Sequence, residues 1–327
     1  MEKRRFKTVV TCNIPIEWTG ELSKISDIII WPGVNGFLMS REHLLSILPE
    51  VDAIVNTADV KADADLLEHA TNLKVIVNAS IGYDNLNLEE ITKRGIWACN
   101  SPGFFHYPVA EYILAGMLNI SRRFAEADRF VRAGKWNSFE PGKWDGKALR
   151  EMSLGIVGLG AIGEDLMKLA KGFGMQVNYY DLKNQNLPGF IQLDELLANS
   201  DFVSINVPLT PSTKNMVNQQ FIDKMKEDAV LINTSRGTVV DQEAMIKALQ
   251  SGQLKGAILD VFESEPNVPE ALKKMENVFL TPHIAGGIKS ARKNCMENSF
   301  KNVYNALTGI KPQNALNNIN QFAEQLR

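Results

Sequence analysis

Three polar residues in the last third of the chain, Arg236, Glu265 and His283, each lie within a few residues of an apolar stretch. An arginine guanidinium can hold a carboxylate and a carbonyl oxygen, and a histidine can donate a proton to that oxygen near neutral pH. A carboxylate beside the histidine would keep it protonated and oriented. Together these residue types suit the reduction of a 2-oxo acid by hydride. Taken singly, a strand-end arginine is more often a surface ion pair, and a histidine before glycine is often part of a turn.

An apolar stretch, Leu154–Val157, runs into a glycine-rich turn of the form GxGxxG. In such a turn the first glycine permits the tight bend, the second lets the backbone approach a pyrophosphate, and the third lets the following helix pack on the strand. The N-terminal end of the helix dipole then faces the phosphates. Glycine turns are common, so the motif alone is weak evidence, but a helix-forming segment at 164–172 and a further strand follow it. The residues of the turn are Gly158, Leu159, Gly160, Ala161, Ile162 and Gly163.

That further strand ends at Asp181, about 20 residues beyond the glycine turn. Dinucleotide-binding folds place there an acid that accepts hydrogen bonds from the adenosine ribose. Because its charge would repel a 2′-phosphate, Asp181 favours NAD(H) over NADP(H). Lys183, two residues later, weakens this preference slightly. The alternative is that Asp181 is a solvated acid at a strand end.

The segments that must position these residues alternate between buried strands and helices. Helices are expected at 63–70 and, between breaks at 100–103 and 134–146, over 109–131. The alternation predicts an α/β protein, in which the loops at the carboxyl ends of parallel strands converge on a ligand crevice. The strands are expected at 9–10, 28–30, 53–55, 75–77, 153–157, 176–180, 202–207, 229–233, 256–259 and 278–280.

The composition is that of an ordinary globular protein, and 327 residues are enough for two domains. Thirty-five basic against 38 acidic residues give no field that would hold nucleic acid or an anionic membrane. Three cysteines without a CxxC pair argue against a disulfide framework or a metal site, and they fit a reducing cytoplasm. The basic start runs into a stretch too short and polar for a signal peptide, and no apolar run approaches membrane-spanning length. We therefore expect a cytoplasmic protein.

These motifs, in this order, resemble the D-isomer-specific 2-hydroxyacid dehydrogenase family over nearly the whole chain. The matching segments are Asn78–Asn85, Asn100–Gly103, Val109–Glu111, Gly158–Gly163, Asp181, Val207–Thr210, Asn233–Gly237, Glu263–Pro266, Thr281–Gly286 and Gly309–Asn314.

The resemblance implies an α/β fold of two doubly wound, Rossmann-like parallel-sheet domains with the active site in the cleft between them. Residues 1–102 and 291–327 would form the substrate-binding domain. Residues 103–290 would form the NAD-binding domain inserted between them, with hinges near 100–103 and near residue 290.

The resemblance also implies a homodimer. The region 109–144 looks like the family's dimerisation arm, in which Trp136 and Trp144 would be interface anchors. Phe139 could reach a partner's cleft.

Roles for individual residues follow from the same resemblance. Arg236 would bind the substrate, His283 would be the acid or base, and Glu265 would be the partner of His283. The backbone amides of Ser80 to Gly82 would cradle the substrate carboxylate. The implied substrate contacts are Asn78, Ser80, Ile81, Gly82, Arg236 and His283. The implied NAD(H) contacts are Gly158, Gly160, Ala161, Ile162, Gly163, Asp181, Val207, Pro208, Thr234, Ser235, Arg236, Asp260, His283 and Gly286.

The absence of arginine at positions 56 and 78 indicates the class of substrate. Family members that act on phosphorylated acids tend to carry phosphate-facing arginines in the segments where this chain has the neutral amides Asn56 and Asn78, and the nearest cation is Lys61. A phosphate without bidentate partners would be poorly bound. Asn78 with Gly82–Asn85 resembles the glyoxylate, hydroxypyruvate and 2-ketogluconate reductase branch, although Asn78 could merely cap a strand end. The sequence predicts reduction of glyoxylate or hydroxypyruvate to the D-hydroxy acid.

Two departures from the family pattern and two rival functions stay open at this point. Bulky residues at 106–108 precede Val109, and Asn87 stands where the family generally has aspartate. One rival is an NAD-binding scaffold or corepressor, which would not need to retain the whole set of Arg236, Glu265 and His283. The other is formate dehydrogenase, which resembles this chain less because it has glutamine at the position of Glu265.

Overall fold

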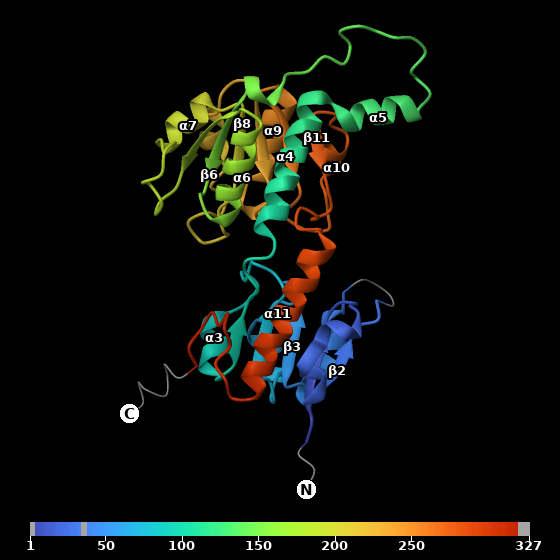
Figure 1. The fold of residues 1–327 in the computed structure, drawn as a ribbon, viewed down its shortest axis with the longest axis vertical. Helices are drawn as coiled ribbons and strands as arrows, with labels where there is room; N and C mark the ends of the chain where they lie inside the picture. The colour runs from blue at the N-terminus through green and yellow to red at the C-terminus, as the bar shows by residue number, and fades with distance from the viewer. Residues whose placement is uncertain (1–3, 34–37, 320–327) are drawn as a thin grey trace. The chain divides into compact units, whose positions relative to one another are not determined.

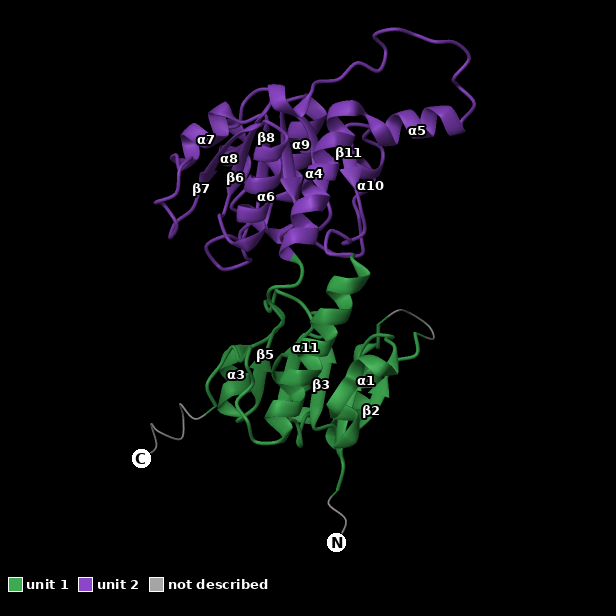
Figure 2. Ribbon diagram, in the orientation of Figure 1, with its two compact units in different colours: residues 1–105, 288–327 green, residues 106–287 purple. Residues whose placement is uncertain are grey.

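The computed structural model describes residues 4–33 and 38–319, so the first three residues of the basic start and the end of the predicted return segment at 320–327 lie outside it. The chain forms two compact units, which Figure 2 distinguishes by colour. The first unit is Met1–Phe105 with Ile288–Arg327, and the second is His106–Gly287. In the described part of the chain, no helix is both long and apolar enough to cross a membrane.

The first unit contains a parallel five-stranded sheet in the order β2-β1-β3-β4-β5. Its strands are β1 (Phe6–Val10), β2 (Ser26–Ile30), β3 (Ala53–Asn56), β4 (Val75–Asn78) and β5 (Trp97–Cys99). Its helices are η1 (Ile16–Lys24), α1 (Arg41–Ile47), η2 (Leu48–Glu50), α2 (Ala64–His69), α3 (Leu88–Lys93) and α11 (Lys289–Leu307). The strands predicted from the apolar runs are confirmed, whereas β5 was not predicted.

Helices cover both faces of this sheet, because successive strand residues point to opposite sides. Val9, Ile54 and Ile76 face the helices α1, α2 and α3. Val75 and Val77 face α11 and η1 on the other side. Both faces are therefore apolar, as the near-continuous hydrophobic runs of these strands predict.

The return segment is tied to the first unit by hydrogen bonds. The hydroxyls of Ser101 and Ser299 lie 2.7 Å apart, and the Asn314 side-chain oxygen accepts from the amides of Asn298 and Asn302. An antiparallel β-bridge also pairs the backbone of Cys99 with that of Ala315. Segments from both ends of the chain thus build one unit.

The second unit contains a parallel six-stranded sheet in the order β11-β10-β9-β8-β6-β7. Its strands are β6 (Ser153–Val157), β7 (Gln176–Tyr180), β8 (Phe202–Ile205), β9 (Ala229–Asn233), β10 (Leu254–Leu259) and β11 (Val278–Leu280). Its helices are α4 (His106–Arg122), α5 (Phe124–Arg132), η3 (Leu149–Glu151), α6 (Ala161–Gly172), α7 (Leu193–Asn199), α8 (Gln219–Asp223), η4 (Gly237–Val239), α9 (Gln242–Ser251) and α10 (Glu270–Lys273).

This sheet is doubly wound. The core on one face includes side chains from α4 and α6, and the core on the other includes side chains from α7, α8, α9 and α10. The strand order reverses between β6 and β8, and in open α/β sheets such a reversal opens a ligand crevice at the carboxyl ends of the strands.

The prediction of one long helix over 109–131 was wrong. The helix breaks at Arg123, whose φ of +54° is left-handed, and continues as α5. The Asn119 side chain caps the new start by accepting from the Ala125 N–H, and Arg123 pairs with Glu126. The broken geometry lets α5 and the loop after it project from the rest of the unit (Figure 1).

Candidate active site

The glycine turn between β6 and α6 has three glycines with different surroundings. Gly158 has a φ of +96°, and a Cβ there would lie 2.8 Å from the carbonyl oxygen of Asn206. A Cβ on Gly163 would lie 2.4 Å from the Gly158 carbonyl oxygen, so this glycine is needed for close packing of helix on strand. A Cβ on Gly160 would meet no atom within 4 Å. The middle of the turn therefore presents bare backbone to open space.

Backbone donors line this open side. No side chain caps α6, and within 4–33 and 38–319 the N–H groups of Gly160, Ala161 and Ile162 have no protein acceptor. Unpaired N–H groups and the positive end of the helix dipole together form an anion site. These residues fit the pyrophosphate of a dinucleotide cofactor.

Asp181, directly after β7, lies against the same turn. Its carboxylate accepts hydrogen bonds from the N–H groups of Leu159 (2.8 Å), Lys183 (2.7 Å) and Asn184 (2.8 Å). Partial burial raises the pKa of Asp181, but these amides lower it more, so the net pKa lies below its ordinary value. The lowered pKa favours the charged form of Asp181. Because a carboxylate has about four acceptor positions and three N–H groups occupy three of them, one remains for a ribose hydroxyl.

The loop after β8 borders the glycine turn. Val207 is half-buried, and a Cβ on Gly158 would lie 3.0 Å from its Cγ1. Pro208 is exposed, and its carbonyl oxygen accepts from the Thr213 hydroxyl at 2.6 Å.

The Arg236 side chain donates to the Ser235 carbonyl at 2.9 Å, and the Asn233 side chain holds the backbone of this loop. The buried Asn233 side chain accepts from the Ser235 N–H and hydroxyl and donates to the Arg236 carbonyl at 3.0 Å. A Cβ on Gly237 would lie 1.9 Å from the carbonyl carbon of Phe262, so this loop packs directly on the loop that carries Glu265. The side chains of Thr234, Ser235 and Arg236 are half-buried.

Glu265 and His283 are brought together by the fold. The His283 Nδ1 lies 2.8 Å from a Glu265 carboxylate oxygen, and the other oxygen accepts from the Phe262 N–H at 3.0 Å. The Glu265 hydrogen bond raises the pKa of His283 above its ordinary value, although burial opposes it. Burial raises the pKa of Glu265, but bonds from His283 and Phe262 lower it more, so the net shift is downward. The His283 side chain is still 52% exposed and can meet a ligand.

Asp260 organises the loop that carries His283. Its fully buried carboxylate accepts from the Thr281 hydroxyl at 2.6 Å and from the N–H groups of Ile284 and Ala285 at 2.8 and 2.7 Å. The Thr281 hydroxyl is also bonded to the Tyr112 hydroxyl. Sequence reasoning missed Tyr112 and Thr281, although Thr281 stands two residues before His283. Gly286, half-buried, follows the residues that Asp260 holds.

Of the substrate residues predicted in the first unit, Asn78 ends β4, and Ser80, Ile81 and Gly82 lie in the loop that follows it. The carbonyl oxygens of Ser80 and Ile81 accept from the Ser101 N–H and the Asn100 side chain. By contrast, among the described residues the structure shows no acceptor for the N–H groups of Ser80, Ile81 and Gly82. The three half-buried residues thus offer free donors, as a carboxylate cradle requires.

Asn78 holds this loop in place. It is fully buried, and its amide donates to the Gly82 carbonyl at 2.9 Å and to the Asn85 side chain at 2.7 Å. Asn56 is likewise buried, donating to the Val77 carbonyl and accepting from the Ala58 N–H. Both amides are engaged by neighbouring protein groups.

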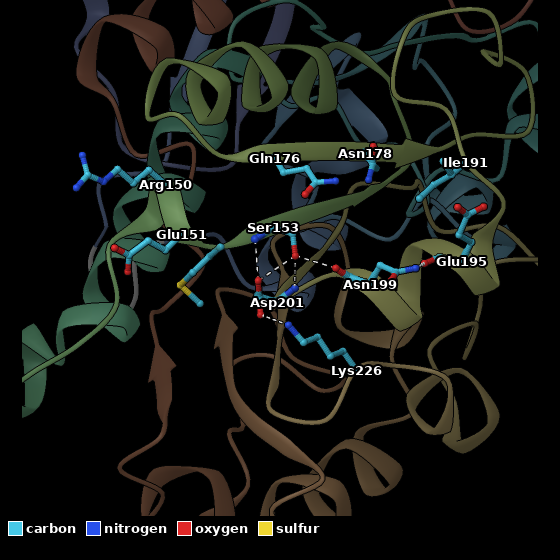
Figure 3. A pocket seen from close by; sticks show the side chains of 11 residues that line it. Arg150, Glu151, Ser153, Gln176, Asn178, Ile191, Glu195, Asn199, Asp201 and Lys226 are labelled. Atoms are coloured by element: carbon cyan, nitrogen blue, oxygen red, sulfur yellow. Dashed lines mark hydrogen bonds and ion pairs between the residues drawn. The ribbon is translucent and has the colours of Figure 1, made fainter.

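A cavity of about 580 Å³ lies in the second unit at the amino-terminal ends of the strands β6 and β7 (Figure 3). Figure 3 shows Asp201 bonded to Ser153 and to Lys226 at its wall. These contacts brace the amino ends of the strands. Among the described residues that line this cavity there is none of the predicted site, so we place the candidate site at the carboxyl edge instead.

The fold, the glycine turn and the paired Glu265 and His283 define an α/β oxidoreductase that binds a dinucleotide. Comparison with known proteins makes the class specific. The family model described as D-isomer specific 2-hydroxyacid dehydrogenase, NAD binding domain, matches residues 114–285. The chain belongs to the D-isomer-specific 2-hydroxyacid dehydrogenase family, and it is an enzyme that uses a nicotinamide cofactor.

Individual relatives extend the similarity to nearly the whole chain. A glyoxylate reductase from Thermococcus litoralis is 41% identical over 322 residues, covering 95% of this chain and 96% of that protein. A solved structure of a protein from Thermus thermophilus has a TM-score of 0.89 at 33% identity, covering 95% of this chain and 100% of that one. An NADPH-dependent glyoxylate/hydroxypyruvate reductase from Sinorhizobium meliloti has a TM-score of 0.81 at 27% identity, covering 95% and 98%. These relatives favour a 2-hydroxyacid dehydrogenase over both alternatives, the NAD-binding scaffold and formate dehydrogenase.

Proposed function

We propose that this enzyme reduces a small 2-oxo acid, glyoxylate or hydroxypyruvate, with NADH and releases the D-2-hydroxy acid where a stereocentre forms. The single observation that carries the proposal is the 2.8 Å contact between His283 Nδ1 and Glu265, in the same unit as a glycine turn that fits a dinucleotide. The similarity to the reductases of Thermococcus litoralis and Sinorhizobium meliloti supports the substrate class.

The proposed roles follow from the chemistry of each group. When bound, NADH supplies the hydride. The Arg236 guanidinium binds the substrate carboxylate and carbonyl oxygen. The bond from Nδ1 to Glu265 fixes the His283 ring, so Nε2, on the other side of the ring, donates the proton as negative charge develops on the carbonyl oxygen. The negative charge of Glu265 stabilises the imidazolium form before the proton is transferred.

The substrate carboxylate is proposed to bind the free N–H groups of Ser80, Ile81 and Gly82. Asn78 serves this cradle by holding the Gly82 carbonyl, which supports an indirect role for its amide. Because Asn56 and Asn78 are neutral and engaged within the protein, neither can replace the arginines that a substrate phosphate needs.

For the cofactor we propose a preference for NADH, in which Asp181 accepts from the adenosine ribose. The lowered pKa of Asp181 supports this, since a carboxylate that stays charged repels a 2′-phosphate. The remaining proposed contacts are Val207, Pro208, Thr234, Ser235, Asp260 and Gly286.

We also propose the organisation of the protein. The unit of residues 106–287 would be the NAD-binding domain and the other unit the substrate-binding domain. The arm, α5 with the loop after it, would form a homodimer through Trp136, Trp144 and Phe139. Trp136 and Phe139 are 62% and 84% exposed in the single chain, whereas the Trp144 ring contacts Phe130 and Arg123 of its own chain. Three free cysteines support a cytoplasmic location. Sedimentation of the wild type and of a Trp136→Ser/Phe139→Ser variant would test the dimer.

The substrate is tested by steady-state NADH oxidation with glyoxylate, hydroxypyruvate, pyruvate and phosphohydroxypyruvate, and by chiral analysis of the glycerate formed. We expect the highest kcat/KM for glyoxylate or hydroxypyruvate and the D product. Phosphohydroxypyruvate should be at least about tenfold poorer, which corresponds to about 1.4 kcal/mol. If phosphohydroxypyruvate had the highest kcat/KM, the assignment would be wrong.

A further inference from the structure

A chain of hydrogen bonds connects helix α4 to the loop that carries His283. The Tyr112 hydroxyl contacts the Thr281 hydroxyl, which in turn lies 2.6 Å from an Asp260 carboxylate oxygen. Burial raises the pKa of Tyr112 to about 12, so its hydroxyl stays protonated. A carboxylate can only accept, so the single Thr281 proton goes to Asp260 and Tyr112 donates to Thr281. The direction of every bond in the chain is therefore fixed.

Asp260 holds the backbone of His283 and of the two residues after it. Its carboxylate accepts from the N–H groups of Ile284 and Ala285, and its backbone carbonyl accepts from the His283 N–H at 2.9 Å. His283 itself has a φ of +54°, a left-handed conformation that is uncommon for a residue with a side chain. Such a backbone persists only where the surroundings hold it, which these bonds do.

The other end of the chain is a firm anchor. Tyr112 lies on α4, which packs against α6 and the strands β10 and β11. Its ring stacks on Phe279 of β11, with centroids 6.4 Å apart and planes within 19°. Removing only the hydroxyl would leave this packing in place.

We propose that Tyr112 and Thr281 are positioning residues for the reaction. Through Asp260 they hold the His283 backbone in its left-handed conformation, so that the imidazole meets Glu265 and presents Nε2 to the substrate. This inference rests on the proposed function, because it concerns the histidine assigned there as proton donor. Neither residue contacts the reacting atoms in this role.

The test compares Tyr112→Phe and Thr281→Val, which remove one hydroxyl each, with Thr281→Ser, which keeps it. Tyr179→Phe is a matched control, because Tyr179 is also a buried tyrosine whose hydroxyl bonds a loop in the same unit, at Leu187. The pKa of His283 is measured by NMR of the imidazole signals in cofactor-free protein. Only four histidines occur, and a His283→Gln spectrum assigns the signal.

The charged groups that act on His283 are Glu265, Asp260 and Arg236. The Glu265 hydrogen bond has the largest effect and raises the pKa, so a misplaced ring should have a lower pKa. A freer Asp260 charge would raise it, but that contribution is smaller. We expect a lower His283 pKa in Tyr112→Phe and Thr281→Val and a near-normal value in Thr281→Ser and Tyr179→Phe.

Turnover with glyoxylate gives the second readout. In the two hydroxyl-deleted variants kcat should fall about tenfold, within the range that small misplacements of catalytic groups cause. The KM for NADH should be unchanged, and the pH at which half of kcat is lost should move down. An unchanged or higher His283 pKa with normal kcat would overturn the inference. A wild type that reduced no 2-oxo acid would instead contradict the proposed function, and the NMR result would still decide whether these hydroxyls position His283.

Discussion

At the scale of the residue, Glu265 is the neighbour with the largest effect on the protonation of His283. Reduction needs the imidazolium form, and Glu265 favours it by accepting the Nδ1–H at 2.8 Å. The hydrogen bond raises the pKa of His283, so activity in the reducing direction should persist to higher pH than for an unpaired histidine. In the oxidising direction, which needs neutral imidazole, the same shift acts against turnover at low pH.

The substitution Glu265→Gln removes the negative charge beside His283 but keeps the size of the side chain. The pKa of His283 should then fall, and the decline of kcat with rising pH should begin at lower pH. Near neutral pH we expect kcat to fall about tenfold or more, because a hydrogen bond to a charged group contributes about 1.5–3 kcal/mol. The pH profile of glyoxylate reduction measures this, and a profile identical to that of the wild type would remove Glu265 from the mechanism.

Asp181 is proposed to act on the choice of cofactor and not on the proton transfer. Asp181→Ala should weaken NADH binding by about 10- to 100-fold, since hydrogen bonds to a charged group contribute about 1.5–3 kcal/mol. NADPH should bind better relative to NADH, because the repelling charge is gone. Fluorescence titration with both cofactors checks this. Equal affinity of the wild type for the two would contradict the role of Asp181.

At the scale of the element, the turn between β6 and α6 separates packing from binding. A methyl group on Gly163 would overlap the Gly158 carbonyl oxygen, whereas one on Gly160 would lie in open space. The same chemical change therefore has two distinguishable effects within one motif.

Gly163→Ala should lower the free energy of unfolding by about 1–3 kcal/mol through overpacking. Gly160→Ala should leave it nearly unchanged and weaken NADH by about tenfold, because the methyl group occupies the approach of the pyrophosphate. Thermal unfolding and NADH titration of both variants provide the comparison. If Gly160→Ala bound NADH normally, the turn would not hold the cofactor as proposed.

The elements also show how far sequence reasoning reaches. Long apolar runs such as 229–233 identify buried strands because both faces of a parallel sheet are covered. The three-residue strand β5 was missed because Trp97–Cys99 is too short to show a period. The break at Arg123 was missed because no glycine or proline marks it. The left-handed turn there is held by the Asn119 side chain, which accepts from the Ala125 N–H, and by the pair of Arg123 with Glu126.

The residues of the candidate site were likewise predicted only in part from the sequence. Glu265 and His283 could be paired because each belongs to a family motif that the sequence displays. The contact of Tyr112 with Thr281 joins residues 169 positions apart, and no motif or periodicity links them. The buried state of Asn78 also follows only from the packed loop.

At the scale of the whole molecule, both ends of the chain build one unit, and the other is inserted between them. The candidate groups are divided accordingly: the glycine turn, Arg236, Glu265 and His283 belong to the inserted unit, and the free amides of Ser80 to Gly82 belong to the other. The proposed cofactor site and the proposed proton donor thus belong to one unit, and a single substitution should separate the two roles.

The most direct test is the kcat of NADH-dependent glyoxylate reduction by the wild type and His283→Gln, with NADH affinity measured on the same samples. The account predicts that the wild type turns over and that the variant loses a factor of about 10²–10⁴ in kcat, the usual contribution of a general acid, while its NADH affinity is unchanged. Near-normal turnover by the variant would contradict the account.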